Sequence, residues 1–158
     1  MKFVVFKLAD EKYAIAVEQV REVVQFKSII SLPRSPEFIE GIIMLRKHGV
    51  AVMDLYQRLN LKAHEGVKHY EHILILRLER MIMGVLVDQV VDIIDIKESQ
   101  IDFNSNIMFQ KVREEVVMGI AHVDNDVLIL LDFKQILNFD EKMSLEKSSS
   151  GKLNHHKE

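Results

Sequence analysis

The sequence contains one structural unit twice, and this duplication limits the folds that the chain can adopt. Residues 41–60 read GIIMLRKHGVAVMDLYQRLN, and residues 119–138 read GIAHVDNDVLILLDFKQILN. Aligned without a gap (119 − 41 = 78), the two stretches share Gly, Ile, Asp, Gln, Leu and Asn at equivalent positions. The match covers turn residues, helix caps and apolar positions together, so it indicates a repeat rather than a similarity of composition.

Each copy has the pattern of a β-hairpin that leads into a short helix. In the first copy, apolar residues 42–45 and 50–53 flank a polar turn at 46–49. We expect Gly49 to take the positive φ that such a turn requires. Asp54 suits a helix N-cap, and Asn60 suits the end of the helix. The sequence therefore predicts strand, turn, strand and capped helical turn in both copies.

The N-terminal part of the chain is also repeated, at a second offset (72 − 2 = 70). Residues 2–24 and 72–94 share two strand-like runs, a helical turn and a third strand, placed at 23–26 in the first copy. Residues 28–39 contain both prolines and are predicted to form a loop. The pseudo-repeats are therefore about 2–60 and 72–138, and they could intertwine. About five short apolar strands in each half favour an all-β fold of small barrels or packed sheets.

Composition restricts the function further. A chain of 158 residues with 48% hydrophobic residues is expected to form one domain, assigned here to residues 1–140, followed by a disordered tail at 141–158. The absence of cysteine excludes disulfides and Cys-ligated zinc. A net charge of −3 gives no electrostatic signature of nucleic-acid binding. We expect no signal peptide and no membrane-spanning segment, since the apolar runs are short.

Candidate chemical sites are weak. His64, His69 and His72 are close in sequence, but they lie in or beside a polar connector, where solvated histidines are more common than zinc ligands. Residues 124–126 lack the glycine and glutamate that a calcium loop needs further on, so a hairpin turn is expected. Asp92 and Asp95 could act as an acid–base pair, although nothing places them in a pocket. No cofactor is predicted, and an interaction module is favoured over an enzyme.

Arg46 is the polar residue that we single out from the repeated unit, because it directly follows an apolar strand and opens the turn. It is either an ordinary exposed turn residue or a guanidinium held by an acid such as Glu22. The sequence alone leaves both interpretations open.

An ordered set of short motifs resembles the CheW family of chemotaxis coupling proteins across residues 2–138. The motifs are YAIxV (13–17), VxEVV (20–24), LP (32–33), EGII (40–43), LR (45–46), VxDLxxRL (52–59), GxxVD (84–88) and GIA (119–121). The resemblance implies two SH3-like five-stranded β-barrel subdomains that share an apolar interface. It also implies a cytoplasmic, non-catalytic adaptor without cofactors, which binds chemoreceptor tips and the regulatory domain of the histidine kinase CheA.

The resemblance also implies two sets of contact residues. Receptor contact would involve Val20, Glu22, Gly41 and Arg46, and Val20 with its repeat equivalent Val90 would line a groove for a helical receptor tip. His72 and Ile73 would lie towards the kinase.

Three positions depart from the family pattern, which usually has Asn, Gly and Pro there. These positions are Met44, Lys47 and Ala51. Two other classes of function stay open: an SH3-like or OB-like barrel that binds nucleic acid, and a His-metal hydrolase. The acidic balance argues against the first.

Overall fold

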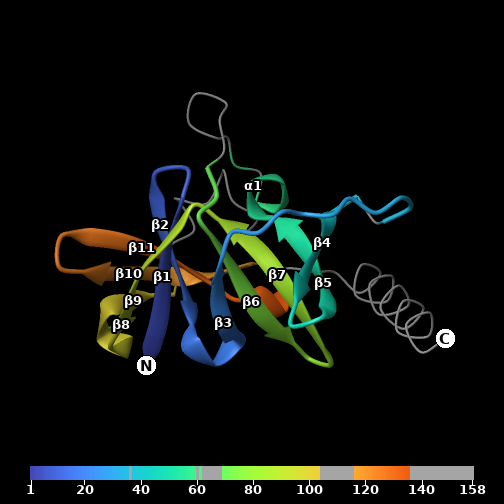
Figure 1. Cartoon of the computed structure of the whole chain (residues 1–158). Coiled ribbons are helices and arrows are strands. Elements are labelled where there is room, and N and C mark those ends of the chain that lie inside the picture. The colour runs from blue at the N-terminus through green and yellow to red at the C-terminus, as the bar shows by residue number, and fades with distance from the viewer. Residues whose placement is uncertain (36, 60, 62–68, 104–115, 136–158) are drawn as a thin grey trace.

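The computed structural model describes residues 1–35, 37–59, 61, 69–103 and 116–135, which form two β-sheets joined side by side (Figure 1). The single α-helix of the described residues, α1 (Leu55–Arg58), lies near the junction, and 3₁₀ turns occupy Val17–Gln19, Glu98–Gln100 and Phe133–Gln135. The strands are β1 (Lys2–Leu8), β2 (Glu11–Ala16), β3 (Val20–Gln25), β4 (Ile39–Leu45), β5 (His48–Asp54), β6 (His72–Leu78), β7 (Met81–Val87), β8 (Gln89–Asp95), β9 (Ile101–Asp102), β10 (Val117–Val123) and β11 (Asp126–Leu131).

Each sheet contains strands from both halves of the chain. The first sheet has the order β8-β1-β2-β11-β10-β9, and the second has the order β3-β6-β7-β5-β4. The hairpin β1–β2 therefore pairs with C-terminal strands, whereas the hairpin β6–β7 pairs with strands of the N-terminal half. The predicted all-β fold of two SH3-like barrel subdomains is confirmed, and the halves exchange their first hairpins. The two-residue strand β9 adds a sixth strand to the first barrel.

The strand registers repeat between the two barrels. The register of β3 on β6 shifts between Val20 and Glu22, and that of β8 on β1 shifts at the equivalent residues Val90 and Asp92. In both barrels one strand pair is parallel, namely β5 with β7 and β11 with β2. Equivalent bulges and equivalent parallel pairs show that the sequence repeat is a structural repeat.

The glycine that begins each copy of the repeated unit allows another segment to pass close to the strand. A Cβ on Gly41 would lie 2.3 Å from the backbone oxygen of Ile30, and one on Gly119 would lie 2.8 Å from that of Asp102. Ile30 lies in the loop predicted at 28–39, and it forms an isolated β-bridge with Ile42 of β4. A side chain at either glycine would force these segments away.

The turn between β4 and β5 differs from the prediction. Positive φ angles occur at Arg46 (49°) and Lys47 (70°), whereas Gly49 lies in β5. The turn contains only two residues, and both have φ > 0, as the tight hairpin turns that match strand twist require. The expectation that Gly49 supplies the positive φ is therefore wrong.

The predicted helix caps are confirmed in both copies. The carboxylate of Asp54 accepts a hydrogen bond from the backbone N–H of Tyr56 (2.9 Å), and Asp132 accepts one from Lys134 (3.0 Å). The first copy continues as α1 and the second as a 3₁₀ turn. Asn60 and Asn138, predicted to end these helices, lie outside the described residues, as does the tail at 141–158.

Three hydrophobic clusters form the core. The largest one joins the two barrels and includes Phe6 and Tyr13 of the exchanged hairpin β1–β2, together with Leu74 and Met83 of β6–β7. Each barrel also has an interior cluster of its own. The shared cluster holds the barrels together, because separating them would expose its apolar surface to water.

A polar network accompanies the shared cluster at one edge. The Tyr56 hydroxyl donates a hydrogen bond to Asp88 (2.6 Å to Oδ2), and the N–H of Ala9 donates to both the Tyr56 hydroxyl (3.0 Å) and Asp88 (3.1 Å). The Tyr70 hydroxyl donates to the buried Asp54 (2.7 Å). Burial, followed by the hydrogen bond to the carboxylate, raises the pKa of Tyr56 and Tyr70 above the usual tyrosine range. Both therefore act as neutral donors. Tyr56 links α1 to the β1–β2 turn and to Asp88 after β7, and Tyr70 holds Asp54 at the end of β5.

We predict that Tyr56→Phe destabilises the protein by about 1–2 kcal/mol, because Asp88 loses its hydroxyl donor and Ala9 N–H loses one acceptor. Urea unfolding followed by circular dichroism measures this change. Ser99→Ala, which removes an exposed hydroxyl, should change the free energy of unfolding by less than about 0.5 kcal/mol. Equal stability of Tyr56→Phe and the wild type would contradict the assigned role of the network.

Candidate functional site: the seam between strands β3 and β4

Arg46 and Glu22 form an ion pair that joins the two edges of the second sheet. The guanidinium Nη2 of Arg46 lies 2.9 Å from Oε2 of Glu22. Glu22 belongs to β3 and Arg46 follows β4, the two edge strands of this sheet. The pair therefore bridges the gap where the barrel closes, which we call the β3–β4 seam. Of the two interpretations of Arg46, the guanidinium held by Glu22 is correct.

The two partners of this ion pair differ in exposure. The Arg46 side chain is 65% exposed, whereas that of Glu22 is only 21% exposed. The second carboxylate oxygen of Glu22, Oε1, is buried and has no hydrogen-bond partner among the described residues. The exposed guanidinium of Arg46 thus lies beside a carboxylate that uses only one of its two oxygens as an acceptor. The exposed guanidinium of Arg46 therefore still has hydrogen-bonding capacity for a ligand.

Exposed hydrophobic side chains occur on the elements that border the seam. They belong to β3, the loop after it and β4, and they are Val23 (39% exposed), Phe26 (44%), Ile30 (48%) and Met44 (43%). Lys27 also crosses the seam and donates a hydrogen bond to the backbone oxygen of Met44 (3.2 Å). A charged pair next to exposed apolar side chains is a composition suited to protein binding, with apolar anchors and polar specificity.

The structure connects Gly41 to this seam but does not connect Val90 to it. Gly41 is buried beneath Ile30, so it supports the seam through packing. Val20 and Val90 occupy equivalent positions in different sheets, and both pack half-buried against the shared cluster. Their common groove stays a prediction.

The two residues predicted to face a kinase have different environments. His72 is half-buried, and its Nδ1 accepts a hydrogen bond from the backbone N–H of Val90 (3.0 Å). Ile73 has no exposed surface and packs inside the second barrel, so the prediction of a direct side-chain contact by Ile73 is corrected to a core role. The sequence repeat carries the signal for this correction, because Ile73 is equivalent to the interior residue Phe3.

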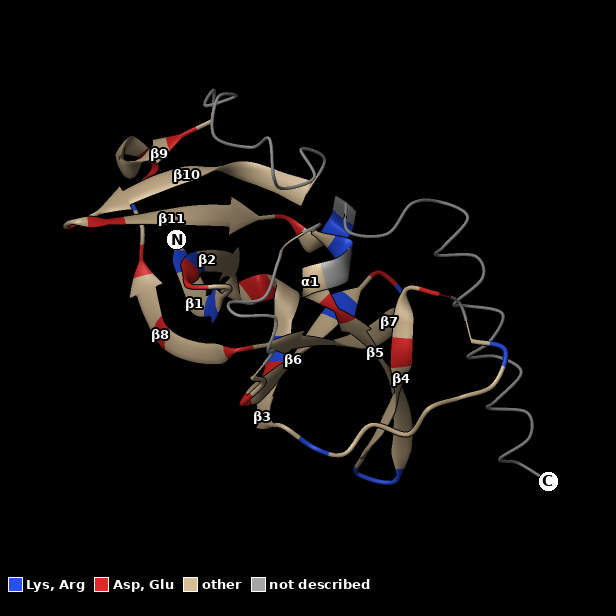
Figure 2. Cartoon of the chain, turned by 90° about the horizontal axis from the view of Figure 1, so that it is seen from above, with Lys and Arg blue, Asp and Glu red and all other residues tan. Residues whose placement is uncertain are grey.

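The equivalent seam of the first barrel carries two acids in place of the ion pair. Asp92 and Asp124 occupy the positions of Glu22 and Arg46, and both line a cavity of about 260 Å³. Lys12 reaches this seam and pairs with Asp126 (2.8 Å). Figure 2 shows the basic β4–β5 turn in blue and the acidic β10–β11 turn in red, well apart on the molecule. Among the residues that the structure describes, only the second barrel closes its seam with an arginine.

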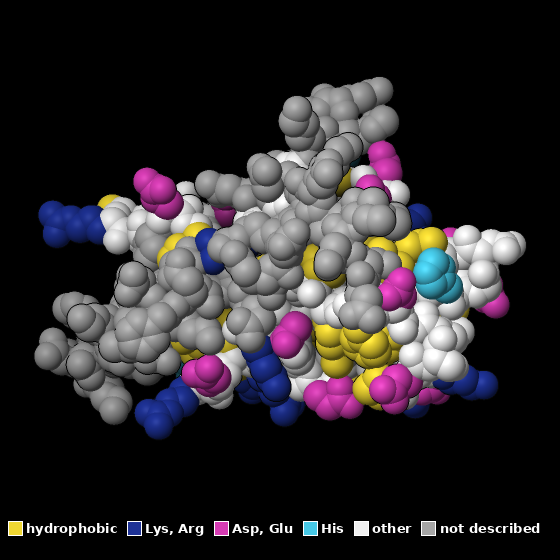
Figure 3. Space-filling model, turned by 180° about the vertical axis from the view of Figure 1, so that it is seen from behind, with side chains coloured by type: hydrophobic (Ala, Val, Ile, Leu, Met, Phe, Trp, Pro, Cys, Tyr) yellow, Lys and Arg dark blue, Asp and Glu magenta, His cyan; other side chains and the backbone are white. Residues whose placement is uncertain are grey.

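The back of the molecule also exposes hydrophobic side chains between acidic ones (Figure 3). Exposed hydrophobic residues of the first sheet are Val91, Ile93 and Val127.

The metal-site candidates find no support in the described residues. No group of three or more His, Asp or Glu residues is placed to hold a metal ion in that part of the chain. His69 is exposed, His72 bonds to Val90, and His64 lies outside the described residues. The predicted turn at 124–126 joins β10 to β11. None of the described helices is long and apolar enough to span a bilayer.

Two of the three departures from the family pattern lie at the seam. Met44 is one of its exposed hydrophobic residues, and Lys47 takes a left-handed conformation (φ 70°) without being glycine. Ala51 lies in β5 and packs against the shared cluster.

We predict that Asp124→Arg stabilises the protein by about 0.5 kcal/mol, because it replaces a second acid near Asp92 with a cation, as in the other barrel. The backbone at this site can accommodate arginine, since Asp124 (φ 53°) has nearly the same φ angle as Arg46 (φ 49°). Urea unfolding at low salt measures the gain. Asp124→Asn separates the loss of the acid from the new ion pair, and adding Asp92→Asn should remove the part due to the pair.

Comparisons with known proteins agree with this geometry. Residues 2–141 match the family model of the CheW-like domain. The chain is 29% identical to "Chemotaxis protein CheW" of Bacillus subtilis, covering 90% of each sequence, and 28% identical to that of Thermotoga maritima, covering 84% of each. Among solved structures it resembles the scaffolding protein TtCheW from Thermoanaerobacter tengcongensis, with a TM-score of 0.76, 33% identity and 89% of each chain covered. The chain therefore belongs to the CheW family of chemotaxis coupling proteins, identified by its CheW-like domain.

Proposed function

We propose that this chain is a non-catalytic adaptor that couples the cytoplasmic tips of chemoreceptors to the regulatory domain of the histidine kinase CheA. Residues 1–140 act as one CheW-like domain in this proposal, which works in the cytoplasm at membrane-associated receptor arrays. Family membership supports the pathway. The observation that carries the proposal is the Arg46–Glu22 ion pair, bordered by exposed hydrophobic residues.

The β3–β4 seam is the proposed receptor side. A helical receptor tip presents an apolar stripe with charged residues beside it, which suits a surface of the same composition. Arg46 is exposed enough to reach a carboxylate on the receptor while it is held in place by Glu22. Gly41 supports this surface by its close packing. Val20 continues it along β3 towards the shared cluster, and a groove shared with Val90 of the other sheet is part of the proposal.

His72 is the proposed contact on the kinase side. The hydrogen bond from Val90 N–H to His72 Nδ1 links His72 to strand β8. Val90 is itself one of the proposed receptor residues. A small displacement of β8 would therefore act on His72 directly. This link is our candidate for communication between the two partners.

We predict that Arg46→Ala weakens co-elution with a receptor-tip fragment by about tenfold and leaves co-elution with the CheA regulatory domain unchanged, since the lost group is a charge-assisted donor. Size-exclusion chromatography of the purified components measures both. Lys47→Ala is the matched control, because it removes a neighbouring exposed cation that makes no salt bridge among the described residues. Unchanged receptor binding by Arg46→Ala would rule out the seam as the receptor side.

We predict the opposite selectivity for His72→Ala. Loss of the imidazole should weaken binding of the CheA regulatory domain several-fold, while the receptor tip is retained. Exposed His122 provides the control, since His122→Ala removes an imidazole from a different sheet. A His72→Ala protein that binds the kinase domain as the wild type does would place the kinase contact elsewhere.

A further inference from the structure

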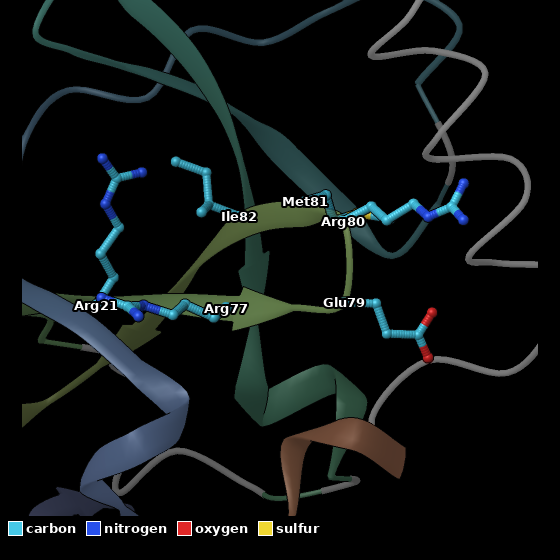
Figure 4. Close-up of a pocket in the computed structure, with 6 residues that line it drawn as sticks. All are labelled: Arg21, Arg77, Glu79, Arg80, Met81 and Ile82. Atoms are coloured by element: carbon cyan, nitrogen blue, oxygen red, sulfur yellow. The ribbon is translucent and has the colours of Figure 1, made fainter.

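Three arginines line a pocket that the proposed receptor and kinase contacts do not use. The pocket measures about 550 Å³ and lies where β6 turns into β7, beside the start of β3 (Figure 4). Arg21 belongs to β3, Arg77 to β6 and Arg80 to the β6–β7 turn, and all three are exposed. The other lining residues are Glu79, Met81 and Ile82.

The charges of these arginines are not balanced by a neighbour. None of the three guanidinium groups has a carboxylate within 4.0 Å among the described residues. Figure 4 shows the carboxylate of Glu79, the one acid of the pocket, and the guanidinium of Arg80 on the side away from Arg21, whereas Arg77 extends towards Arg21. In a chain whose net charge is −3, three uncompensated cations at one hollow form a local site for anions.

The fold does not require this arrangement. The first barrel has the same hairpin and the same bulge, at an offset of 70 residues. The equivalent positions there hold only one cation, and they are Val91, Lys7 and Asp10. Neither the turn nor the bulge therefore needs arginine, so the cluster is a property of the second barrel alone.

The lining of the pocket indicates what kind of anion fits. Guanidinium groups bind carboxylates in a two-pronged geometry. Met81 and Ile82 are half-buried and add an apolar surface, and the Arg21 side chain lies opposite Ile82 (Figure 4). A ligand with carboxylates next to apolar side chains matches both features better than a small inorganic ion does.

We propose that the arginine pocket formed by Arg21, Arg77 and Arg80 binds an acidic segment of a protein partner, in which Asp or Glu alternates with apolar residues. This is a third contact surface, beyond those in the proposed function. It adjoins the receptor side, because Arg21 lies between Val20 and Glu22 in β3. Its test needs neither receptor nor kinase, so its failure would leave the proposed function unaffected.

The test measures fluorescence anisotropy of a labelled peptide of alternating Glu and Val residues, mixed with the full-length chain at low salt. The triple variant Arg21→Gln, Arg77→Gln and Arg80→Gln should lose about tenfold or more in affinity. The control variant removes the same number of positive charges from exposed sites elsewhere, through Lys2→Gln, Lys7→Gln and Lys97→Gln. It should bind the peptide with nearly the wild-type affinity, and thermal unfolding should show that both variants fold.

Three results would overturn the proposal. The first is that the wild type does not bind the peptide. The second is an equal loss of affinity in both triple variants, which would indicate general charge attraction. The third is arginine-dependent binding of inorganic phosphate or of vesicles containing phosphatidylglycerol without binding of the peptide, which would assign the pocket to phosphate groups.

Discussion

The exchange of hairpins between the two halves of the chain is the constraint on which the rest of the structure depends. Because β1–β2 completes the sheet of the C-terminal strands and β6–β7 completes that of the N-terminal strands, neither repeat can form its barrel alone. The largest hydrophobic cluster lies between the exchanged hairpins and therefore stabilises both barrels at once. Folding thus requires contacts between residues far apart in sequence, and the two barrels are fixed relative to each other. A fixed relationship between two barrels is useful to an adaptor, whose partners must be held in a defined geometry.

The two barrels have the same backbone but different seams. Equivalent bulges, parallel pairs and glycines show how closely the backbone repeats. At the closing edge, one barrel carries an arginine–glutamate pair and the other carries two aspartates. Surface residues can differ between the two copies of a repeat, because the turns, bulges and core positions maintain the common backbone. The charge of each seam, rather than the fold, therefore distinguishes the two surfaces for partners.

Much of the fold could be predicted from the repeats, since hairpins, caps and apolar alternation are local properties. Asp54 and Asp132 were identifiable as caps because the capping bond spans only two residues. The turn at Arg46 and Lys47 was misplaced because a two-residue turn with φ > 0 at non-glycine residues violates the ordinary preference. Ile73 was misassigned because a family resemblance gives a position along the chain but not the direction of the side chain.

The sequence by itself determined the duplication, the strand content and the membership of Arg46 in a repeated turn, because these follow from residue spacing and local conformational preference. Only the tertiary structure decided that Arg46 pairs with Glu22, that His72 accepts a hydrogen bond from Val90, and that three arginines line one pocket. Each of these contacts joins residues from different strands or turns. Strand order and register bring them together, and neither is specified by a single segment of the chain.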